Sequence, residues 1–592
     1  MTKARRILLV ILGGLAAVVV ALILTWELAG DWLLDAAVHR LMADRFDGMP
    51  PERTDMQAVQ TVRLRMRDGV ELATHIYLPQ GKGPWPVILV RDPYSLSRYL
   101  SCRIFVRYGY ACVHQDVRGR FDSGGSWYPL VNERNDGIDT LAWILKQPWQ
   151  NRRLALWGES YLGLVEWAMA DKLPPEVKTF VAGVSHGDFY QMIYHNGMFV
   201  QGIVGLWSSG LSQPLLKTFT AQDRWKNDIA GRIPAAGVDP HLFLASWPSY
   251  RDYLLHPERD DPYWHSPTYG AIHDSYRGVH VPVMMVARSY DFFLPGMLET
   301  FRHLPMHTQS VLYLGPGEHG GAPGDLKVDH PNRHYFADTI AWFDHFLMDK
   351  PLPASLAPGY DVYINGADRW QHYADWPGTT EPLTLYLNDV ARSHGCERGR
   401  LTAGPPARES AVRYRYDPRH PVPTRGTSYS LSTSLVPSAV AEQKSDLCGR
   451  PDVLSFSSAA FPKAQLIAGG MHVKLLVASD APDTAFTVKV SEHFADGRVY
   501  NIRDDISTLG LRNGAARRLV YRPGDKVEVD FDLTPIAWQM HKDSHLRFDV
   551  SSSNFPVFNA HPNRAGLWST ALSPIVAIQT LYGGSLEIPL AD

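Results

Sequence analysis

A serine in a G-x-S-x-x-G turn is the feature of this sequence that most directly suggests chemistry. Ser160 lies in the run Gly158-Glu159-Ser160-Tyr161-Leu162-Gly163, after an apolar segment. A turn of this kind places a serine hydroxyl at the sharp bend between a strand and a helix. Gly158 and Gly163 carry no β-carbon, so we expect the strand and the helix to approach each other closely around the turn. Backbone N–H groups at the start of the helix would then face the oxygen of a reacting carbonyl.

A serine nucleophile needs a general base, and the base needs an orienting carboxylate. In α/β-hydrolases these residues follow in the order Ser, Asp or Glu, His. Asp291 follows the apolar run 281–287, and His319 follows the apolar run 310–314. Because both runs read as strands of a parallel sheet, we expect both side chains at the same carboxyl edge as Ser160.

Other acids compete with Asp291 for the orienting role. Asp274, Asp338 and Asp344 are the alternatives, but none of them directly follows a predicted strand. Asp338 and Asp344 also come after His319, which breaks the expected order. We interpret Glu318 as a solvated neighbour of His319.

An oxyanion hole requires two hydrogen-bond donors. The backbone N–H of Tyr161, the residue after the nucleophile, is the first candidate. The second donor normally comes from the loop after the third strand, which here reads Arg91-Asp92-Pro93-Tyr94. This loop has no run of glycines, so the phenol of Tyr94 is a candidate donor, and a buried structural tyrosine is the alternative.

The elements that must position these residues alternate along the chain from about residue 60 to 350. Short apolar runs predict strands buried on both faces: 86–91, 111–115, 154–157, 180–184, 281–287 and 310–314. Helical patterns over 135–146 and 295–303 lie between them. This alternation predicts an α/β fold with a mostly parallel sheet, over 59–186 and 276–350. The aromatic-rich stretch 187–275 interrupts it and is either a helical cap over the site or ordinary helical core.

The pattern changes after a proline-rich linker. Pro351, Pro353 and Pro358 precede a region with strictly alternating runs such as 526–533 and 545–550. Apolar residues at every second position, with frequent turn residues between the runs, predict an antiparallel β-sandwich over 359–592.

The N-terminus differs from the rest of the chain. Basic residues at 3, 5 and 6 precede an uncharged apolar run over 7–24. Eighteen residues at helical rise span about 27 Å, enough for a transmembrane helix. We predict that 1–30 is a transmembrane anchor with a cytoplasmic N-terminus, and a cleaved signal peptide is the alternative. Residues 31–58 read as a juxtamembrane helix with a proline-rich exit. Either reading places the rest of the chain outside the cytoplasm, in the periplasm, on the cell surface or secreted.

Composition sets further bounds. At 592 residues, with 45% hydrophobic and 20% charged residues, the chain is a globular protein of more than one domain. The net charge of −3 does not indicate a nucleic-acid-binding protein. Four cysteines are consistent with export, and we expect Cys102 to pair with Cys112 and Cys396 with Cys448, four free thiols being the alternative.

The motifs together resemble the CocE/NonD hydrolases, a family that includes bacterial cocaine esterase, X-prolyl dipeptidyl peptidases and α-amino-acid ester hydrolases. The resemblance covers nearly all of the chain after residue 55. It is carried by runs 91–94, 109–119, 158–163, 288–291, 315–319, 483–486 and 551–556. It implies an α/β-hydrolase domain with a helical cap, and a C-terminal jelly-roll sandwich of the galactose-binding type. It also implies a triad of Ser160, Asp291 and His319, an oxyanion hole of Tyr94 and the Tyr161 amide, and no metal or organic cofactor.

Departures from the family pattern bear on the substrate. Amino-acid ester hydrolases carry a carboxylate pair two and three positions after the triad acid, where this chain has Phe293 and Leu294. An uncharged, aromatic or bulky acyl group therefore fits better than a cationic one. Residues 542–545 replace the Pro-Gly-His-Arg run of many relatives, beside a loop whose Trp538 and Met540 we expect to line the substrate pocket.

Three functions follow from this sequence. The first is hydrolysis of a carboxylic ester through an acyl-enzyme. The second is amide cleavage by an X-prolyl dipeptidyl peptidase or acylase, which needs an acidic anchor for a substrate ammonium, and Asp188 is the candidate. The third is carbohydrate binding by the sandwich beside an inactive hydrolase domain. Family members often form homo-oligomers, although no self-complementary surface is evident in the sequence.

Overall fold

The computed structural model describes residues 46–592 except 95–100, 212–230, 232–234, 236–246, 322–323, 329–333, 379, 432–437 and 592. The predicted anchor over 1–30 and most of the predicted juxtamembrane helix lie outside the described residues. The described end of that segment, 46–58, contains turns and one β-bridge but no helix. Among the helices in the described ranges, none is both long and apolar enough to cross a membrane.

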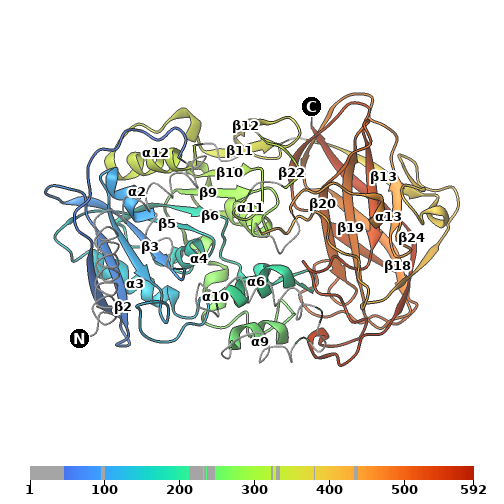
Figure 1. Ribbon diagram of the computed structural model, residues 1–592, viewed down its shortest axis with the longest axis horizontal. Helices are drawn as coiled ribbons and strands as arrows, with labels where there is room; N and C mark the ends of the chain where they lie inside the picture. The colour runs from blue at the N-terminus through green and yellow to red at the C-terminus, as the bar shows by residue number, and fades with distance from the viewer. Residues whose placement is uncertain are drawn as a thin grey trace, which may run out of the picture.

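A ten-stranded sheet forms the first half of the molecule (Figure 1). Its order is β1-β2-β4-β3-β5-β6-β9-β10-β11-β12, parallel from β4 to β11 and antiparallel at both edges. The strands are β1 (Gln60–Arg65), β2 (Glu71–Tyr77), β3 (Trp85–Asp92), β4 (Ala111–Asp116), β5 (Gln150–Glu159), β6 (Val177–Gly183), β9 (Val283–Arg288), β10 (Val311–Gly315), β11 (Gly359–Ile364) and β12 (Arg369–Tyr373). Each of the six strands predicted for the α/β half is present, which confirms the mostly parallel sheet.

Helices cover both faces of this sheet, because its central strands are apolar on both sides. Residues of α2 (Ser101–Arg107) and α12 (Tyr335–Met348) share one buried cluster with Val90, Ala155 and Val286. Residues of α3 (Glu133–Ile144), α4 (Tyr161–Trp167) and α11 (Leu294–His303) share a second cluster with Leu89, Leu156 and Met285. Adjacent strand residues thus pack on opposite sides, as expected for a doubly covered sheet.

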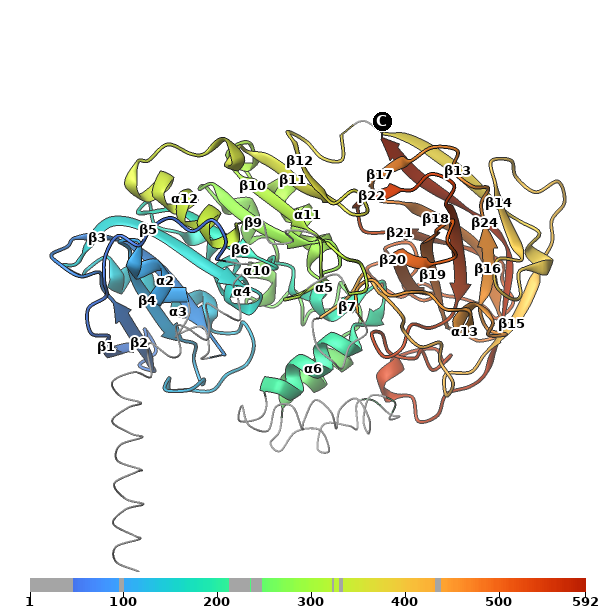
Figure 2. The same cartoon turned by 45° about the horizontal axis from the view of Figure 1, so that its top comes forward.

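The insertion between β6 and β9 carries several helices and one small hairpin. These are α5 (Phe189–Ile193), β7 (Tyr194–His195), β8 (Met198–Phe199), α6 (Gln201–Leu211), α9 (Pro248–Leu255) and α10 (Tyr269–His273). Figure 2 shows α6 at the junction of the two halves of the molecule. The insertion contacts the second half directly, since His195 Nε2 lies 2.5 Å from Asp505 Oδ1 and His195 Nδ1 lies 2.6 Å from the Tyr429 hydroxyl.

The second half is a β-sandwich, on the right in Figure 1. Its strands form one connected twelve-stranded set, and the interior holds Phe456, Val488, Val529, Phe548 and Leu586. The elements are β13 (Glu381–Asn388), β14 (Gly399–Thr402), β15 (Val412–Tyr416), α13 (Ser445–Cys448), β16 (Leu454–Ser457), β17 (Gln465–Gly469), β18 (His472–Ser479), β19 (Ala485–His493), β20 (Val499–Thr508), β21 (Val527–Asp532), β22 (Ile536–Met540), β23 (His545–Ser551) and β24 (Ala577–Ala591).

Two details of the predicted sandwich require correction. Strands β11 and β12 fall after the predicted boundary at 359, yet they pair with β10 and complete the first sheet. The proline-rich segment therefore leads back from α12 to the edge of that sheet, and the pairing of the sandwich begins only with β13. Strand β23 alternates in sequence but is buried on both faces, because the Arg547–Asp549 ion pair neutralises its polar side.

Both predicted cysteine pairs are confirmed as disulfides. Cys102 is bonded to Cys112, which links α2 to β4, and Cys396 is bonded to Cys448, which links the loop after β13 to α13. Each pair lies within one half of the molecule, so neither crosslinks the two halves.

Candidate active site

Ser160 occupies the sharp turn between β5 and α4. Its backbone has φ +56° and ψ −126°, a conformation that L-residues rarely adopt. Such strain is typical of a nucleophile whose hydroxyl is held clear of the helix that follows. A β-carbon at Gly158 would lie 2.3 Å from the backbone of Leu162, and one at Gly163 would lie 2.0 Å from Ser185 Oγ. The predicted close approach at both glycines is therefore confirmed.

Three side chains meet at the carboxyl edge of the sheet. His319 Nε2 lies 2.9 Å from Ser160 Oγ, and His319 Nδ1 lies 2.7 Å from Asp291 Oδ2. Asp291 follows β9 and His319 follows β10, as the sequence predicted. With Nδ1–H donated to the carboxylate, Nε2 keeps the lone pair that accepts the serine proton.

The acid of this relay is tightly held. Asp291 is buried, and its second oxygen accepts the backbone N–H of Phe293 at 2.8 Å. The alternative acids lie elsewhere, since Asp274 pairs with Arg277 and Asp344 binds Arg53, Tyr110 and Lys350. Asp338 lies within α12.

Tyr94 is positioned as a donor to the oxygen of a bound carbonyl. Its hydroxyl lies within hydrogen-bonding reach of the Ser160 hydroxyl. Burial raises the pKa of Tyr94 to about 12, so the phenol stays protonated at neutral pH. The Trp207 indole of α6 donates to the same phenol oxygen at 3.1 Å, which leaves the phenol proton free to point at the site.

The backbone N–H of Tyr161 is the candidate for the second donor. As the first residue of α4, its N–H has no acceptor within the helix. The Tyr161 side chain points the other way, because its hydroxyl donates to Glu133 at 2.5 Å and accepts the N–H of Leu130 at 2.9 Å. The start of α4 is thereby anchored to the start of α3.

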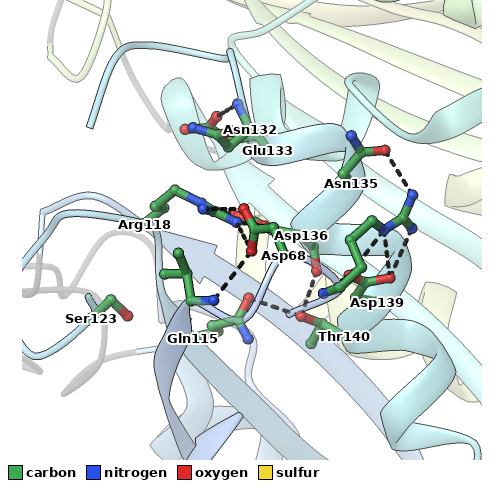
Figure 3. A network of polar contacts seen from close by, with 12 residues as sticks. Asp68, Gln115, Arg118, Ser123, Asn132, Glu133, Asn135, Asp136, Asp139 and Thr140 are labelled. Atoms are coloured by element: carbon green, nitrogen blue, oxygen red, sulfur yellow. Dashed lines mark hydrogen bonds and ion pairs between the residues drawn. The ribbon is translucent and has the colours of Figure 1, made fainter. Parts of the chain in front are cut away.

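A polar network fixes α3 against the sheet (Figure 3). Arg118 donates to Asp136 of α3 at 3.0 and 2.7 Å and to Asp68 at 2.6 Å. The Thr140 hydroxyl donates to Gln115 at 2.9 Å, and the same oxygen of Gln115 accepts from Arg91. Arg91, a buried residue of the 91–94 motif, also donates to the backbone carbonyl of Glu133 at 2.7 Å. The 91–94 motif therefore has a structural role through Arg91, in addition to the role of Tyr94.

The sandwich reaches into the site through a contact that the sequence did not reveal. Glu318 is buried, not solvated as predicted, because it accepts hydrogen bonds from the Ser430 hydroxyl and from the Ala439 N–H at 3.0 Å. The His319 N–H donates to the Ser430 carbonyl at 3.4 Å, and the Ser430 N–H donates to the Tyr290 carbonyl at 3.0 Å. One segment of the sandwich therefore contacts the residue beside Asp291 as well as His319 itself. The sequence alone does not reveal which distant segments pair with each other, so it could not predict this contact.

Aromatic rings surround the reacting groups on both sides. The rings of Phe292 and Phe293 lie 4.8 and 5.7 Å from the His319 ring. Around Tyr161, the Trp207 ring is stacked at 6.0 Å and the Trp127 ring lies edge-on at 5.6 Å. These rings suit apolar or aromatic substrate groups.

The four predicted pocket residues divide into two in the hydrolase half and two in the core of the sandwich. Phe293 packs against the His319 ring, and Leu294 is buried in the hydrolase core at the start of α11. Trp538 and Met540 have no exposed surface and belong to the sandwich core, where the Trp538 indole donates to Glu492 at 2.7 Å. The prediction that these last two residues line a substrate pocket is wrong, because β22 turns their side chains into the sandwich.

Comparison with known proteins adds a second line of evidence. Residues 68–321 match the family model of the X-Pro dipeptidyl-peptidase (S15 family), and residues 354–585 match that of the X-Pro dipeptidyl-peptidase C-terminal non-catalytic domain. A cocaine esterase of Rhodococcus sp. (strain MB1 Bresler) is 29% identical over 541 residues, which cover 86% of this chain and 92% of the relative.

Solved structures share the complete fold. An aminopeptidase from a marine sediment Thaumarchaeota archaeon has a TM-score of 0.76 at 21% identity, over 92% of this chain and 98% of that chain. An α-amino acid ester hydrolase has a TM-score of 0.75 at 22% identity, over 92% of this chain and 99% of that chain. The α/β half and the sandwich thus occur together in these proteins as well.

The geometry at Tyr94 predicts a graded loss of turnover. Replacement of Tyr94 by Phe removes one oxyanion donor and should lower kcat by about 10²–10³-fold with little change in KM. Replacement of Trp207 by Phe removes the hydrogen bond that orients the phenol but keeps both oxyanion donors and an aromatic ring, so its loss of kcat should be smaller. Steady-state kinetics on a p-nitrophenyl ester measures both. Tyr386→Phe in the sandwich is the control, and wild-type kcat in Tyr94→Phe would contradict the assignment.

Proposed function

Since the chain belongs to the CocE/NonD family of serine hydrolases, we propose that it cleaves carboxylic esters with an uncharged, aromatic or bulky acyl group. The observation that carries the proposal is the hydrogen-bonded relay of Ser160, His319 and Asp291 beside a protonated Tyr94.

The reaction follows from this geometry. Ser160 attacks the ester carbonyl while His319 Nε2 takes its proton, and Asp291 stabilises the resulting imidazolium. The Tyr94 hydroxyl and the Tyr161 N–H stabilise the charge that develops on the carbonyl oxygen. His319 then protonates the leaving alcohol, and an acyl-enzyme remains. A water molecule activated by the same imidazole hydrolyses this intermediate and frees Ser160.

The uncharged character of the acyl group rests on what lies next to the relay. Phe292 and Phe293 occupy the region after Asp291 and pack against the His319 ring. Trp127 and Trp207 lie beside Tyr161, on the oxyanion side. Rings on both sides favour a flat or bulky apolar group over an ammonium group, which would require a carboxylate partner.

Amide cleavage next to a free N-terminus is the second candidate, because the matched family model and one structural relative are named for peptidases. The acidic anchor suggested for it is Asp188. Its carboxylate already pairs with Arg259 at 2.7 Å and lies 3.5 Å from His273. Although burial opposes ionisation, these partners lower the pKa of Asp188 far below its usual value. A carboxylate whose charge is balanced in this way is a poor site for a substrate ammonium, which favours the ester.

A substrate panel tests the proposal. We expect p-nitrophenyl butyrate and phenyl or benzoyl esters to be hydrolysed at least about 10²-fold more efficiently, by kcat/KM, than Gly-Pro-p-nitroanilide. Ser160→Ala should lose at least about 10³-fold in kcat and all labelling by a fluorophosphonate probe. Ser185→Ala, which changes the serine packed behind Gly163, is the matched labelling control. Faster cleavage of the prolyl anilide would favour the peptidase, and an unlabelled wild-type chain would favour a binding protein.

The apolar run over residues 7–24 supports a proposal about location. We infer that one N-terminal helix anchors the chain and that the α/β half and the sandwich both lie outside the cytoplasm. The two disulfides support this inference, because disulfides persist in oxidising compartments. A homo-oligomer is compatible with either location.

Fractionation of cells that express the full chain tests the anchor. The protein should sediment with membranes, resist extraction by salt and dissolve in detergent, and added protease should reach it from the extracytoplasmic side. A soluble exported protein whose first residue lies beyond about position 30 would instead support the cleaved signal. Protection from external protease would contradict the location.

A further inference from the structure

Three side chains with metal-binding chemistry meet on the sandwich. They are Glu397, in the loop before β14, His493, the last residue of β19, and His545, the first residue of β23. His493 and His545 face each other directly in the antiparallel ladder. Their rings are only 4.4 Å apart, so two imidazoles project side by side from one end of the sheet.

The Glu397 carboxylate lies against both rings. Its Oε1 is 2.7 Å from His493 Nδ1, and its Oε2 is 2.8 Å from His545 Nε2. All three donor atoms lie within 4.8 Å of one another, a spacing that a single ion can bridge.

The position of the carboxylate is fixed by its own loop. Glu397 has φ +57°, a left-handed conformation that is unusual for this residue type. The preceding residue, Cys396, is bonded to Cys448 of α13. Because the disulfide and the strained backbone constrain the loop, little conformational entropy remains to be lost when the carboxylate binds a ligand.

The charge around the cluster is compatible with a divalent cation. Arg547, two residues after His545, has its guanidinium paired with Asp549 at 3.0 and 2.6 Å. The side chains of Glu397, His493 and His545 keep 18%, 27% and 25% of their surface exposed, so an ion can enter from solvent. Glu397 also borders a groove of about 760 Å³ on this face of the sandwich.

We propose that Glu397, His493 and His545 bind a divalent transition metal ion of the Zn²⁺ class. Two imidazoles and one carboxylate suit Zn²⁺, whereas Ca²⁺ and Mg²⁺ prefer oxygen ligands alone. Three protein ligands leave at least one coordination position, which faces the solvent and takes water. Each imidazole must present a lone pair where it now donates an N–H, so binding displaces these protons to the other ring nitrogen or to solvent.

The site has a structural consequence that is independent of ester hydrolysis. None of its ligands belongs to the relay around Ser160. A bound ion joins the disulfide-bonded loop to two neighbouring strands, and it stabilises the sandwich because it binds the folded state alone.

Metal binding by the intact chain tests the proposal. Untagged full-length protein in detergent is stripped with a chelator and titrated with Zn²⁺ by calorimetry, and bound zinc is counted by elemental analysis. We expect about one zinc per chain, proton release on binding, and a rise in the temperature of the first unfolding transition. Co²⁺ in place of Zn²⁺ should give visible d–d absorption bands. The rate of p-nitrophenyl butyrate hydrolysis should not change.

Variants separate this site from adventitious binding. His493→Ala, His545→Gln and Glu397→Gln should each lower zinc affinity at least about 10-fold and remove the thermal shift and the cobalt bands. His472→Gln is the matched control, because His472 pairs with Asp532 at 2.7 Å across two other strands of the same sandwich without a second histidine. No binding to the wild type, or equal binding by these variants and the control, would overturn the proposal.

Discussion

The contact between the sandwich segment at Ser430 and two loops of the hydrolase half is the constraint on which the rest of the structure depends. Parallel strands β9 and β10 end at Arg288 and Gly315, so the sheet no longer supports the residues that follow them. Asp291 and His319 lie in those unsupported loops. The backbone of Ser430 joins the two loops, since it donates to the Tyr290 carbonyl and accepts the His319 N–H. Its hydroxyl and the Ala439 N–H fix Glu318.

A buried cation strengthens the same junction. Arg503 of β20 is fully buried, with its guanidinium 4.9 Å from the centre of the Tyr290 ring, and it donates to the Thr534 and Pro535 carbonyls at 2.8 and 2.9 Å. Burial lowers the pKa of Arg503 to about 10, so the group still carries its charge at neutral pH. A buried charge requires such partners, and here they come from both halves. Tyr290, the residue before Asp291, is therefore held by the sandwich from two directions.

Local patterns predicted much of this molecule. Apolar runs located the central strands, and the chain order of Ser160, Asp291 and His319 located the relay, because strand ends in a parallel sheet gather at one edge. Period two alone could not assign β11 and β12 to the first sheet, since a short strand that mixes polar and apolar residues reads the same in either sheet. The predicted roles of Glu318, Trp538 and Met540 failed for a related reason. Whether a polar or aromatic residue faces solvent, substrate or core depends on which distant segment covers it, as Ser430 covers Glu318.

The relay at the sheet edge and the sandwich that supports it explain why the two halves occur together. The sheet supplies Ser160 and the strand ends, and the insertion supplies Trp207, which orients Tyr94. The sandwich supplies the partners that fix the acid and base loops. Displacement of a catalytic group by about 1 Å costs on the order of 10²-fold in rate, so this support bears directly on turnover.

Kinetics of Glu318→Ala tests this central claim most directly. The change removes the acceptor of two buried hydrogen bonds beside His319 but deletes none of the reacting groups. The account predicts that kcat and the rate of fluorophosphonate labelling fall together, by about 10–10²-fold, with a smaller change in KM and a folded circular dichroism spectrum. Glu299→Ala, on the exposed side of α11, should behave as wild type. A folded Glu318→Ala protein with wild-type kcat and labelling rate would contradict the account.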